Sequence, residues 1–386
     1  MSNLNITHDA QDFQSAQKEF RAGGILYRQA TLDDDAALRA LLRGNDMDSW
    51  VNLAFEREPS FFEGENLVGK STAVIALDEQ RHQIPVGMYI CSALQVHING
   101  DVENAGYLGG LRVNQNYRRR IRILKGGFAS IPELISDRQN LSCWFTSVGV
   151  ENSKARRILE ADLEGMPRYR FAGSMETLAF STRQAKSNRL LQRATIKDIP
   201  AIVDFFNKQA SSYQFSHVLS ETWLLSLNGK QGLSLEDFLL LKDGKEIFGC
   251  MAVWDQRKYK QTVVRGYQFP LNTFRSAYNL FARVRGRNLL PEAGDRLEQV
   301  FLSFFALDNR VHEVAVDIVR EGMFRVAEKN ALIGCLGLSD RNPLTGILRS
   351  ALHPDRYSTC IETVSWPRDM LPELDGRPVQ PEVAVL

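Results

Sequence analysis

The sequence is poor in the residues on which disulfide and metal chemistry depend. Its 386 residues include only five cysteines and six histidines. The cysteines lie far apart in apolar runs, which is typical of buried, reduced thiols, and they are Cys91, Cys143, Cys250, Cys335 and Cys360. No spacing of cysteines and histidines matches a zinc site. These scarcities exclude a disulfide framework, argue against metal catalysis and predict a cytoplasmic protein.

Excess charge and long apolar runs are missing as well. The 47 basic and 46 acidic residues leave a formal net charge of +1, which argues against a globally basic nucleic-acid binder. No apolar run has the length of a membrane-spanning helix, and the polar N-terminus is unlike a secretory signal. We therefore expect neither a nucleic-acid nor a membrane partner. The hydrophobic content of 44% is that of a chain that buries full cores, and the length indicates two or three domains.

Two distant stretches of the sequence share one pattern. Arg28–Leu42 and Gln192–Phe206 both contain Ala-Thr-(Leu/Ile)-x-Asp, followed by apolar residues at helical spacing. Thr31 and Thr195 are suitable N-caps for the helices that follow. After each stretch comes the same order of a hairpin, a long strand, a helix, a strand, a helix and a final strand.

This repetition predicts an α+β fold built twice. The polar segment Ser181–Arg189 has the composition of a linker. We therefore predict two tandem domains of one topology, residues 1–182 and 190–386. Each is expected to contain a mixed, mostly antiparallel sheet flanked by helices.

The segment Tyr107–Gly127 carries the strongest functional signal. An apolar strand, Leu108–Val113, runs into arginines at positions 118, 119, 120 and 122, just where a helix should begin. A helix N-terminus offers backbone N–H groups and positive potential to a diphosphate, and arginines add charge-assisted hydrogen bonds. Taken alone, the cluster fits an exposed basic helix turn, or a patch that faces nucleic acid, better than it fits a diphosphate site.

With its surroundings, the segment resembles the acetyl-CoA motif of the GNAT superfamily, the Gcn5-related N-acetyltransferases. Leu111 and Val113 match the end of the family's strand, and Tyr117 with the arginines after it matches the loop. Asn152 and Ala155 match the family's later Asn-x-x-Ala turn. The resemblance implies acetyl-CoA, or another acyl-CoA, as co-substrate. It also implies acetyl transfer to a primary amine of a small molecule or an amino acid.

The resemblance further implies which residues hold the cofactor. The main chain of Leu111, Arg112 and Val113 would hold the pantetheine arm and the thioester carbonyl, and Asn152 would bind the arm. The phosphate loop would consist of Arg118, Arg119, Arg120, Ile121, Arg122 and Ile123. The family has small residues where this chain has Ile121 and Ile123, so the loop departs from the usual pattern.

The catalytic groups match the family less well. The family's general acid is a tyrosine, and Leu159 stands at its position. Tyr107 and Tyr169 are the candidate acids, and Glu103, at the start of the long strand, is the candidate base. No histidine neighbours a cysteine, so we expect the amine to attack the thioester directly, without an acyl-enzyme. Acidic and aromatic residues in Asn45–Asn66, where the family has helices beside the acceptor, would attract a cationic amine.

The second half lacks a basic loop at the corresponding place. Asp308, Glu313 and Asp317 would repel a diphosphate there, so we predict a degenerate cofactor site. Two other functions fit the sequence. One is a non-catalytic GNAT-like protein that senses an acyl-CoA or binds a partner, and the other is an N-acyltransferase that uses longer acyl chains.

Overall fold

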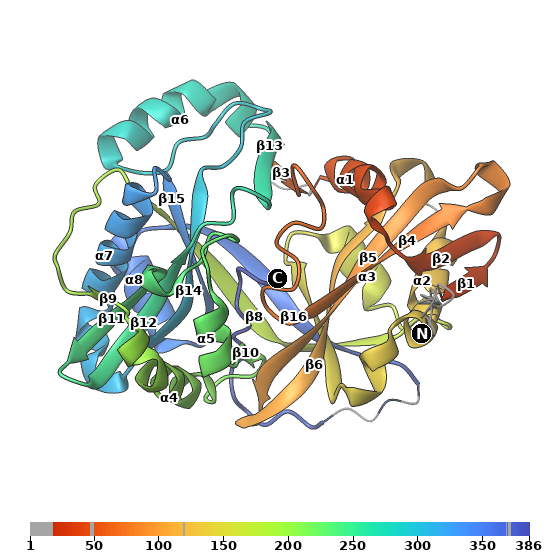
Figure 1. The fold of residues 1–386 in the computed structure, drawn as a ribbon. Helices are drawn as coiled ribbons and strands as arrows, with labels where there is room; N and C mark the ends of the chain where they lie inside the picture. The colour runs from red at the N-terminus through yellow and green to blue at the C-terminus, as the bar shows by residue number, and fades with distance from the viewer. Residues whose placement is uncertain (1–17, 47–49, 119, 368, 370–371) are drawn as a thin grey trace, which may run out of the picture.

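A computed structural model describes residues 18–46, 50–118, 120–367, 369 and 372–386 (Figure 1). The strands are β1 (Glu19–Ala22), β2 (Ile25–Gln29), β3 (Val51–Glu56), β4 (Lys70–Asp78), β5 (Ile84–Ile98), β6 (Asp101–Val113), β7 (Cys143–Gly149), β8 (Arg168–Ser181), β9 (Gln192–Arg193), β10 (Ser216–His217), β11 (Phe238–Asp243), β12 (Glu246–Trp254), β13 (Gln261–Tyr267), β14 (Gln299–Leu307), β15 (Ile333–Ser339) and β16 (Asp355–Ser365). The helices are α1 (Asp35–Arg43), α2 (Ile121–Leu134), α3 (Ser153–Leu159), α4 (Ile199–Ala210), α5 (Glu221–Ser226), α6 (Leu271–Arg285), α7 (Ala315–Glu328) and α8 (Pro343–Leu352). Within these ranges, no helix combines the length and the apolar character needed to cross a membrane.

Most strands join one mixed sheet of 14 strands, in the order β1-β2-β4-β5-β6-β7-β16-β8-β15-β14-β12-β11-β9, with β10 paired to β5. Neighbouring strands are antiparallel except for the pairs β6–β7 and β14–β15, which are parallel. Helices flank the sheet along its length (Figure 1). The predicted α+β class, with a mixed, mostly antiparallel sheet flanked by helices, is confirmed.

The last strand of each half crosses into the other half. β8 ends the first half in sequence but pairs with β15, and β16 ends the second half but pairs with β7. The two crossing strands pair with each other, Ile361 opposite Gly173, and run side by side in the middle of Figure 1. The division at 1–182 and 190–386 stays a prediction. In the sheet, however, each half is completed by a strand from the other.

The two Ala-Thr stretches fold alike. Thr31 and Thr195 each form a capping box, in which the threonine N–H donates to the carboxylate of Asp34 or Asp198 at 2.8 Å. Each box starts a short 3-10 turn that continues into α1 or α4. This reciprocal bonding satisfies donors that a helix start leaves without partners. The predicted N-caps are therefore confirmed.

One element differs from its prediction. The segment Asn45–Asn66 contains strand β3 where a helix was expected, and β3 pairs with β13 as a separate two-stranded sheet. Its alternating Val, Leu and Phe side chains favour an extended chain. Glu56 on β3 is buried and forms an ion pair with Arg265 on β13. Its carboxylate is therefore already neutralised and does not serve to attract a cationic amine. Asp48, another acid of this segment, lies outside the described residues.

Different helices cover the two faces of the first-half sheet. On one face, called the α1 face here, Leu38 of α1 packs in a cluster with Met88 of β5. On the opposite face, called the α2 face, Ile123 of α2 and Leu159 of α3 pack in a cluster with Leu108 of β6. A third cluster spans both halves of the chain and contains Tyr107 on the α1 face. Whether a side chain lies on the α1 face or on the α2 face therefore decides from which side of the sheet it can contact a ligand.

Candidate functional site

The two central strands of the first half part before they end. β6 and β7 pair in parallel from Ala105 and Cys143 to Leu108 and Thr146, and the Thr146 hydroxyl donates to the Leu108 carbonyl at 2.7 Å. Beyond that point β6 continues to Val113 paired with β5 alone among the described strands. Its N–H groups on the β7 side are therefore available to a ligand, whereas the Leu111 carbonyl accepts a hydrogen bond from the Arg112 guanidinium at 2.8 Å.

A β-bulge marks the same stretch of β6. Met88 pairs with Arg112 and Ile90 with Gly109, so Tyr89 faces two residues, Gly110 and Leu111. Gly110 has a φ of 61°, and a Cβ there would lie 2.7 Å from Ile90 Cδ1. Glycine adopts this conformation readily, whereas a side chain here would also be forced against Ile90.

The bulge also decides which way the next side chains point. Leu111 and Val113 pack on the α2 face, against the cluster that contains Leu108. Arg112 lies on the α1 face, because it pairs with Met88 and paired residues share a face of a sheet.

The loop after β6 leads to the N-terminus of α2, with Arg120 as N-cap. The amides of Arg118, Arg120 and Ile123 donate to backbone carbonyls within the loop, at 3.4, 2.8 and 3.0 Å. The amides of Ile121 and Arg122 open the helix and have no acceptor within it. These two amides are therefore the backbone donors best suited to a diphosphate.

Side chains add positive charge at this helix start, whose first turn contains no acidic residue. Arg118 is exposed and donates to Asn45 Oδ1 at 3.1 Å, whereas the Arg120 guanidinium lies 4.7 Å from the centre of the Tyr117 ring. Arg122 is exposed on the first turn. Arg119 lies outside the described residues.

The two isoleucines of the loop differ in position. The Ile121 side chain is 41% exposed, so it points to solvent and leaves its own amide accessible. Ile123 is buried in the α2-face cluster, and its carbonyl accepts a hydrogen bond from the Tyr27 hydroxyl at 2.8 Å. Of the two isoleucines, only Ile123 therefore belongs to the core.

Asn152 caps α3 at the end of the neighbouring strand. Its Oδ1 accepts a hydrogen bond from the Ala155 amide at 3.2 Å, and the residue is exposed. The side-chain oxygen of Asn152 is therefore used to cap the N-terminus of α3. A ligand would be held through the N–H donors of the same group.

Three hydroxyl side chains gather on the α1 face where β6 and β7 part. The Tyr107 hydroxyl lies 2.9 Å from Ser147 Oγ of β7. Burial raises the pKa of Tyr107, and burial also raises the pKa of Tyr357 on β16. The Tyr357 hydroxyl lies so close to Gly149 that a Cβ there would be 2.2 Å from it. We call Tyr107, Ser147 and Tyr357 the hydroxyl cluster.

The other two predicted catalytic residues lie elsewhere. Tyr169 packs on the α2 face against Phe128, with ring centres 6.1 Å apart. It pairs with Val364 of β16, which in turn pairs with Trp144 near the start of β7, the end distant from the parting. Burial raises its pKa. Glu103 is exposed at the opposite end of β6, roughly 26 Å from Leu111 at about 3.3 Å per residue. The structure does not bring either residue to the hydroxyl cluster.

Glu362 is a titratable residue of this region that no sequence motif singles out. It is 1% exposed and lies opposite Thr146, one strand away from the parting. Burial, together with the nearby Glu160 of α3, raises its pKa to about 7. Its Oε2 is buried without a hydrogen-bond partner among the described residues. A carboxyl group that titrates near neutrality therefore lies on the α2 face of the site.

The five cysteines are free and buried. Burial raises the pKa of each thiol above its usual value. A thiol held protonated is a poor nucleophile. Among the described residues, no group of three His, Cys, Asp or Glu side chains is arranged to hold a metal ion.

The second half has a corresponding parting between β14 and β15. The strands pair only from Gln299 to Phe301, and a bulge follows at Phe304 and Phe305. The Phe304 amide donates to the carboxylate of Glu382 at 2.7 Å. The donors of the bulge are thus partly occupied by the C-terminal segment, residues 378–386.

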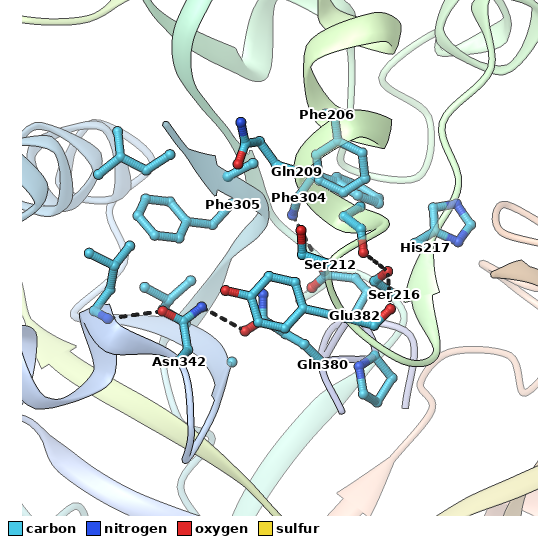
Figure 2. A pocket seen from close by; sticks show the side chains of 18 of the residues that line it. Phe206, Gln209, Ser212, Ser216, His217, Phe304, Phe305, Asn342, Gln380 and Glu382 are labelled. Carbon is cyan, nitrogen blue, oxygen red and sulfur yellow. Dashed lines mark hydrogen bonds between the residues drawn. The ribbon is translucent and has the colours of Figure 1, made fainter. Parts of the chain in front are cut away.

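Further contacts hold this segment in place. The Asn342 side chain and the Ser339 amide both donate to Gln380 Oε1, at 2.9 and 3.1 Å, and Figure 2 shows the bond from Asn342. A cavity of about 240 Å³ remains beside the segment, smaller than the roughly 300–1,000 Å³ of most small-molecule sites. These contacts give a physical reason for the predicted degenerate cofactor site, which stays a prediction.

Comparison of the sequence with protein-family models and with curated proteins found no match. Solved structures do match. N-myristoyltransferase of Saccharomyces cerevisiae with bound myristoyl-CoA aligns with a TM-score of 0.59 and 11% identity, over 95% of this chain and 91% of that chain. A GCN5-related N-acetyltransferase from Sphaerobacter thermophilus aligns with a TM-score of 0.55 and 12% identity, over 92% and 98%. At such identities the likeness shows the fold. The chain has the GNAT fold, as the sequence predicted.

Proposed function

We propose that the protein is an acyl-CoA-dependent N-acyltransferase, which transfers an acetyl group to a primary amine of a small molecule or an amino acid. One observation carries the proposal: the parting of β6 and β7 lies beside the bulge at Gly110 and just before the N-terminus of α2. This combination offers backbone groups to a thioester and positive potential to a diphosphate.

The donor would be held by the backbone. The main chain of Leu111, Arg112 and Val113 would bind the pantetheine arm and the thioester carbonyl. The opening amides of α2 and the arginine side chains around them would bind the phosphates, and Asn152 would bind the arm. In this proposal the protein acts in the cytoplasm, without a nucleic-acid or membrane partner.

The reaction would be a direct attack. The nitrogen of the neutral amine forms a bond to the thioester carbon, the carbon–sulfur bond breaks, and the thiolate takes up a proton. Tyr107 is the proposed proton donor, because burial raises its pKa and keeps its hydroxyl protonated. The proton that the amine releases passes to water. No cysteine takes part.

Two other functions each have one supporting observation. An N-acyltransferase that uses longer acyl chains is favoured by the fold likeness to N-myristoyltransferase. An acyl-CoA sensor without catalysis is favoured by Leu159, which is buried where the family has its tyrosine.

The test is to incubate the purified chain with acetyl-CoA or longer acyl-CoAs and a panel of amines, and to measure N-acylated products by mass spectrometry. Thermal stability with each acyl-CoA is measured in parallel, because a ligand that binds the native state raises the melting temperature. Stabilisation with turnover supports the transferase, and the preferred acyl-CoA fixes the chain length. Stabilisation without turnover favours the sensor. If no acyl-CoA stabilises the protein and no amine is acylated, both the transferase and the sensor are contradicted.

A further inference from the structure

The side chain of Arg112 is a partly buried cation, and no acid affects its pKa. Its Nε is buried without a hydrogen-bond partner, and one Nη donates to the neighbouring Leu111 carbonyl at 2.8 Å. Burial lowers the pKa of Arg112, and the groups that oppose this effect are Tyr107 and Tyr357. None of the ion pairs found among the described residues includes Arg112, although its Nε is buried.

Several other partly buried arginines of the chain have carboxylate partners, whereas Arg120 lies over the Tyr117 ring. The pairs are Arg28–Asp34, Arg39–Glu58, Arg57–Glu65, Arg138–Asp369 and Arg257–Asp255. A buried charge without an opposite charge is unfavourable, because desolvation is not offset by attraction. An apolar residue at this position would avoid the cost of desolvating Nε. We take this as a sign that a ligand supplies the missing anion.

The neighbours of Arg112 are suited to an anion. The hydroxyl cluster lies beside it and consists of groups that donate hydrogen bonds when protonated. Exposed Glu151 helps to raise the pKa of Tyr357, and no acid is among the groups that affect the pKa of Arg112. A planar guanidinium with hydroxyl donors is the arrangement that binds a carboxylate in two-pronged fashion.

The face of the sheet indicates which substrate carries that carboxylate. Arg112 lies on the α1 face, whereas α2, whose N-terminus is the proposed phosphate site, packs on the opposite face. A ligand that reaches Arg112 therefore approaches from the side opposite to the coenzyme. The backbone of Leu111, which would hold the thioester carbonyl, is the adjacent residue.

We propose that Arg112 binds the carboxylate of the acceptor, so that the acceptor is an amino acid or another amine with a nearby carboxylate. The inference rests on the proposed function, because it names the acceptor class of that same site. A carboxylate bound at Arg112 would keep an amine one or two bonds away beside the thioester carbon. Such positioning is an effective source of rate enhancement.

The test compares amino acids with their amides, which keep the amine and lose the carboxylate charge. The wild-type protein should use the acids with a kcat/KM roughly 10- to 100-fold higher, the range expected for charge-assisted hydrogen bonds. Arg112→Gln should remove this preference and leave the KM for acetyl-CoA unchanged. Arg112→Lys should restore part of it. Arg118→Gln, at the proposed phosphate site, should raise the KM for acetyl-CoA and keep the preference for acids.

Several results would overturn the inference. One is equal use of acids and amides by the wild type, and another is an unchanged preference in Arg112→Gln. A carboxylate could also arrive on the acyl group, so succinyl-CoA is tested beside acetyl-CoA. If Arg112→Gln loses only succinyl transfer, the carboxylate belongs to the donor and the acceptor assignment is wrong.

A binding measurement separates this inference from the proposed function. Arg112→Met should raise the melting temperature of the ligand-free protein, because it removes an unpaired buried charge. With free coenzyme A present, amino acids should stabilise the wild type and not Arg112→Met. If no acyl-CoA and amine pair gives turnover but this difference is observed, the proposed function fails and the carboxylate site stands. If amino acids stabilise both proteins equally or neither, the carboxylate site is refuted.

Discussion

Glu362 of β16 lies opposite Thr146 of β7, at the pair of strands where the two halves of the chain meet. The hydroxyl of Thr146 in turn bonds to the last residue of β6 that pairs with β7. A carboxyl group from the end of the sequence thus lies beside the candidate site of the first half. The strand exchange makes that site a product of both halves.

Glu362 should make stability depend on pH in a definite direction. Its pKa is about 7 in the folded protein against 4.5 for an ordinary glutamate, so the folded state keeps the proton to higher pH. The unfolded chain ionises first, and the free energy of unfolding should therefore fall as pH rises from about 4.5 to about 7. Denaturant titrations at about pH 4.5 and about pH 8 should show this loss, of about 1–3 kcal/mol, in the wild type and not in Glu362→Gln. Equal pH dependence in both proteins would contradict the assignment.

The general fold was predictable, because local signals agreed with it. The capping boxes at Thr31 and Thr195 and the long strand before the arginines are properties of short segments, readable without knowledge of tertiary contacts. The exchange of β8 and β16 was not predictable. The choice of partner for each strand depends on contacts distant in sequence, which no local pattern reveals.

The same limit explains what was missed at the site. Tyr357 and Glu362 belong to β16, which by sequence order should complete the second half. Arg112 was selected for its backbone, because only the register across the bulge reveals that its side chain points to the α1 face without an acidic partner. The helix predicted in Asn45–Asn66 was wrong because pairing with β13, far away in sequence, stabilises an extended chain there.

Gly110 should be sensitive to the smallest substitution. Gly110→Ala would force a side chain into a φ of 61° and against Ile90, so we expect a loss of about 1–3 kcal/mol in the free energy of unfolding. Because the bulge positions the backbone of Leu111, kcat/KM should fall as well. Gly266→Ala is the matched control, since a Cβ at this strand glycine meets nothing within 4 Å. Equal tolerance of the two substitutions in thermal unfolding and in activity would contradict the role of the bulge.

The proposed phosphate site should respond to charge and to salt. Replacing exposed Arg118 and Arg122 by alanine should weaken acyl-CoA binding by about 1–3 kcal/mol for each arginine, because each would form charge-assisted hydrogen bonds to phosphate. Calorimetric titration at low and high salt measures the affinity, and the double variant should be less salt-dependent than the wild type. Arg320→Ala, an exposed arginine of α7 paired with Asp317, should bind like the wild type. Unchanged affinity for acyl-CoA in the double variant would rule out this phosphate-binding site.

Glu382 should stabilise the second half. Its partly buried carboxylate accepts hydrogen bonds from the amides of Phe304 and Ala384, at 2.7 and 3.2 Å. Glu382→Ala would leave the Phe304 amide unpaired, so the free energy of unfolding should fall by about 2 kcal/mol or more. Glu313→Ala, at an exposed position of the same half, should change it little. Chemical denaturation measures the free energy of unfolding of both variants. Equal values would mean that the C-terminal segment does not stabilise the bulge at Phe304.

Tyr107 is the residue on which the proposed proton transfer depends. Tyr107→Phe removes the hydroxyl but keeps the ring, which packs against Phe145 with centres 5.3 Å apart. Loss of a general acid lowers kcat by roughly 10²–10⁴-fold at most, and the loss should shrink with acyl donors whose thiol is more acidic. A purely structural role would lower stability by about 1 kcal/mol, because the hydrogen bond to Ser147 is removed, and would leave kcat nearly unchanged.

The five Cys→Ala variants provide the complementary test. Each should turn over nearly as the wild type does, because their buried thiols have raised pKa values. An acyl-cysteine trapped by intact-protein mass spectrometry, or a single cysteine variant without activity, would replace direct attack by an acyl-enzyme mechanism.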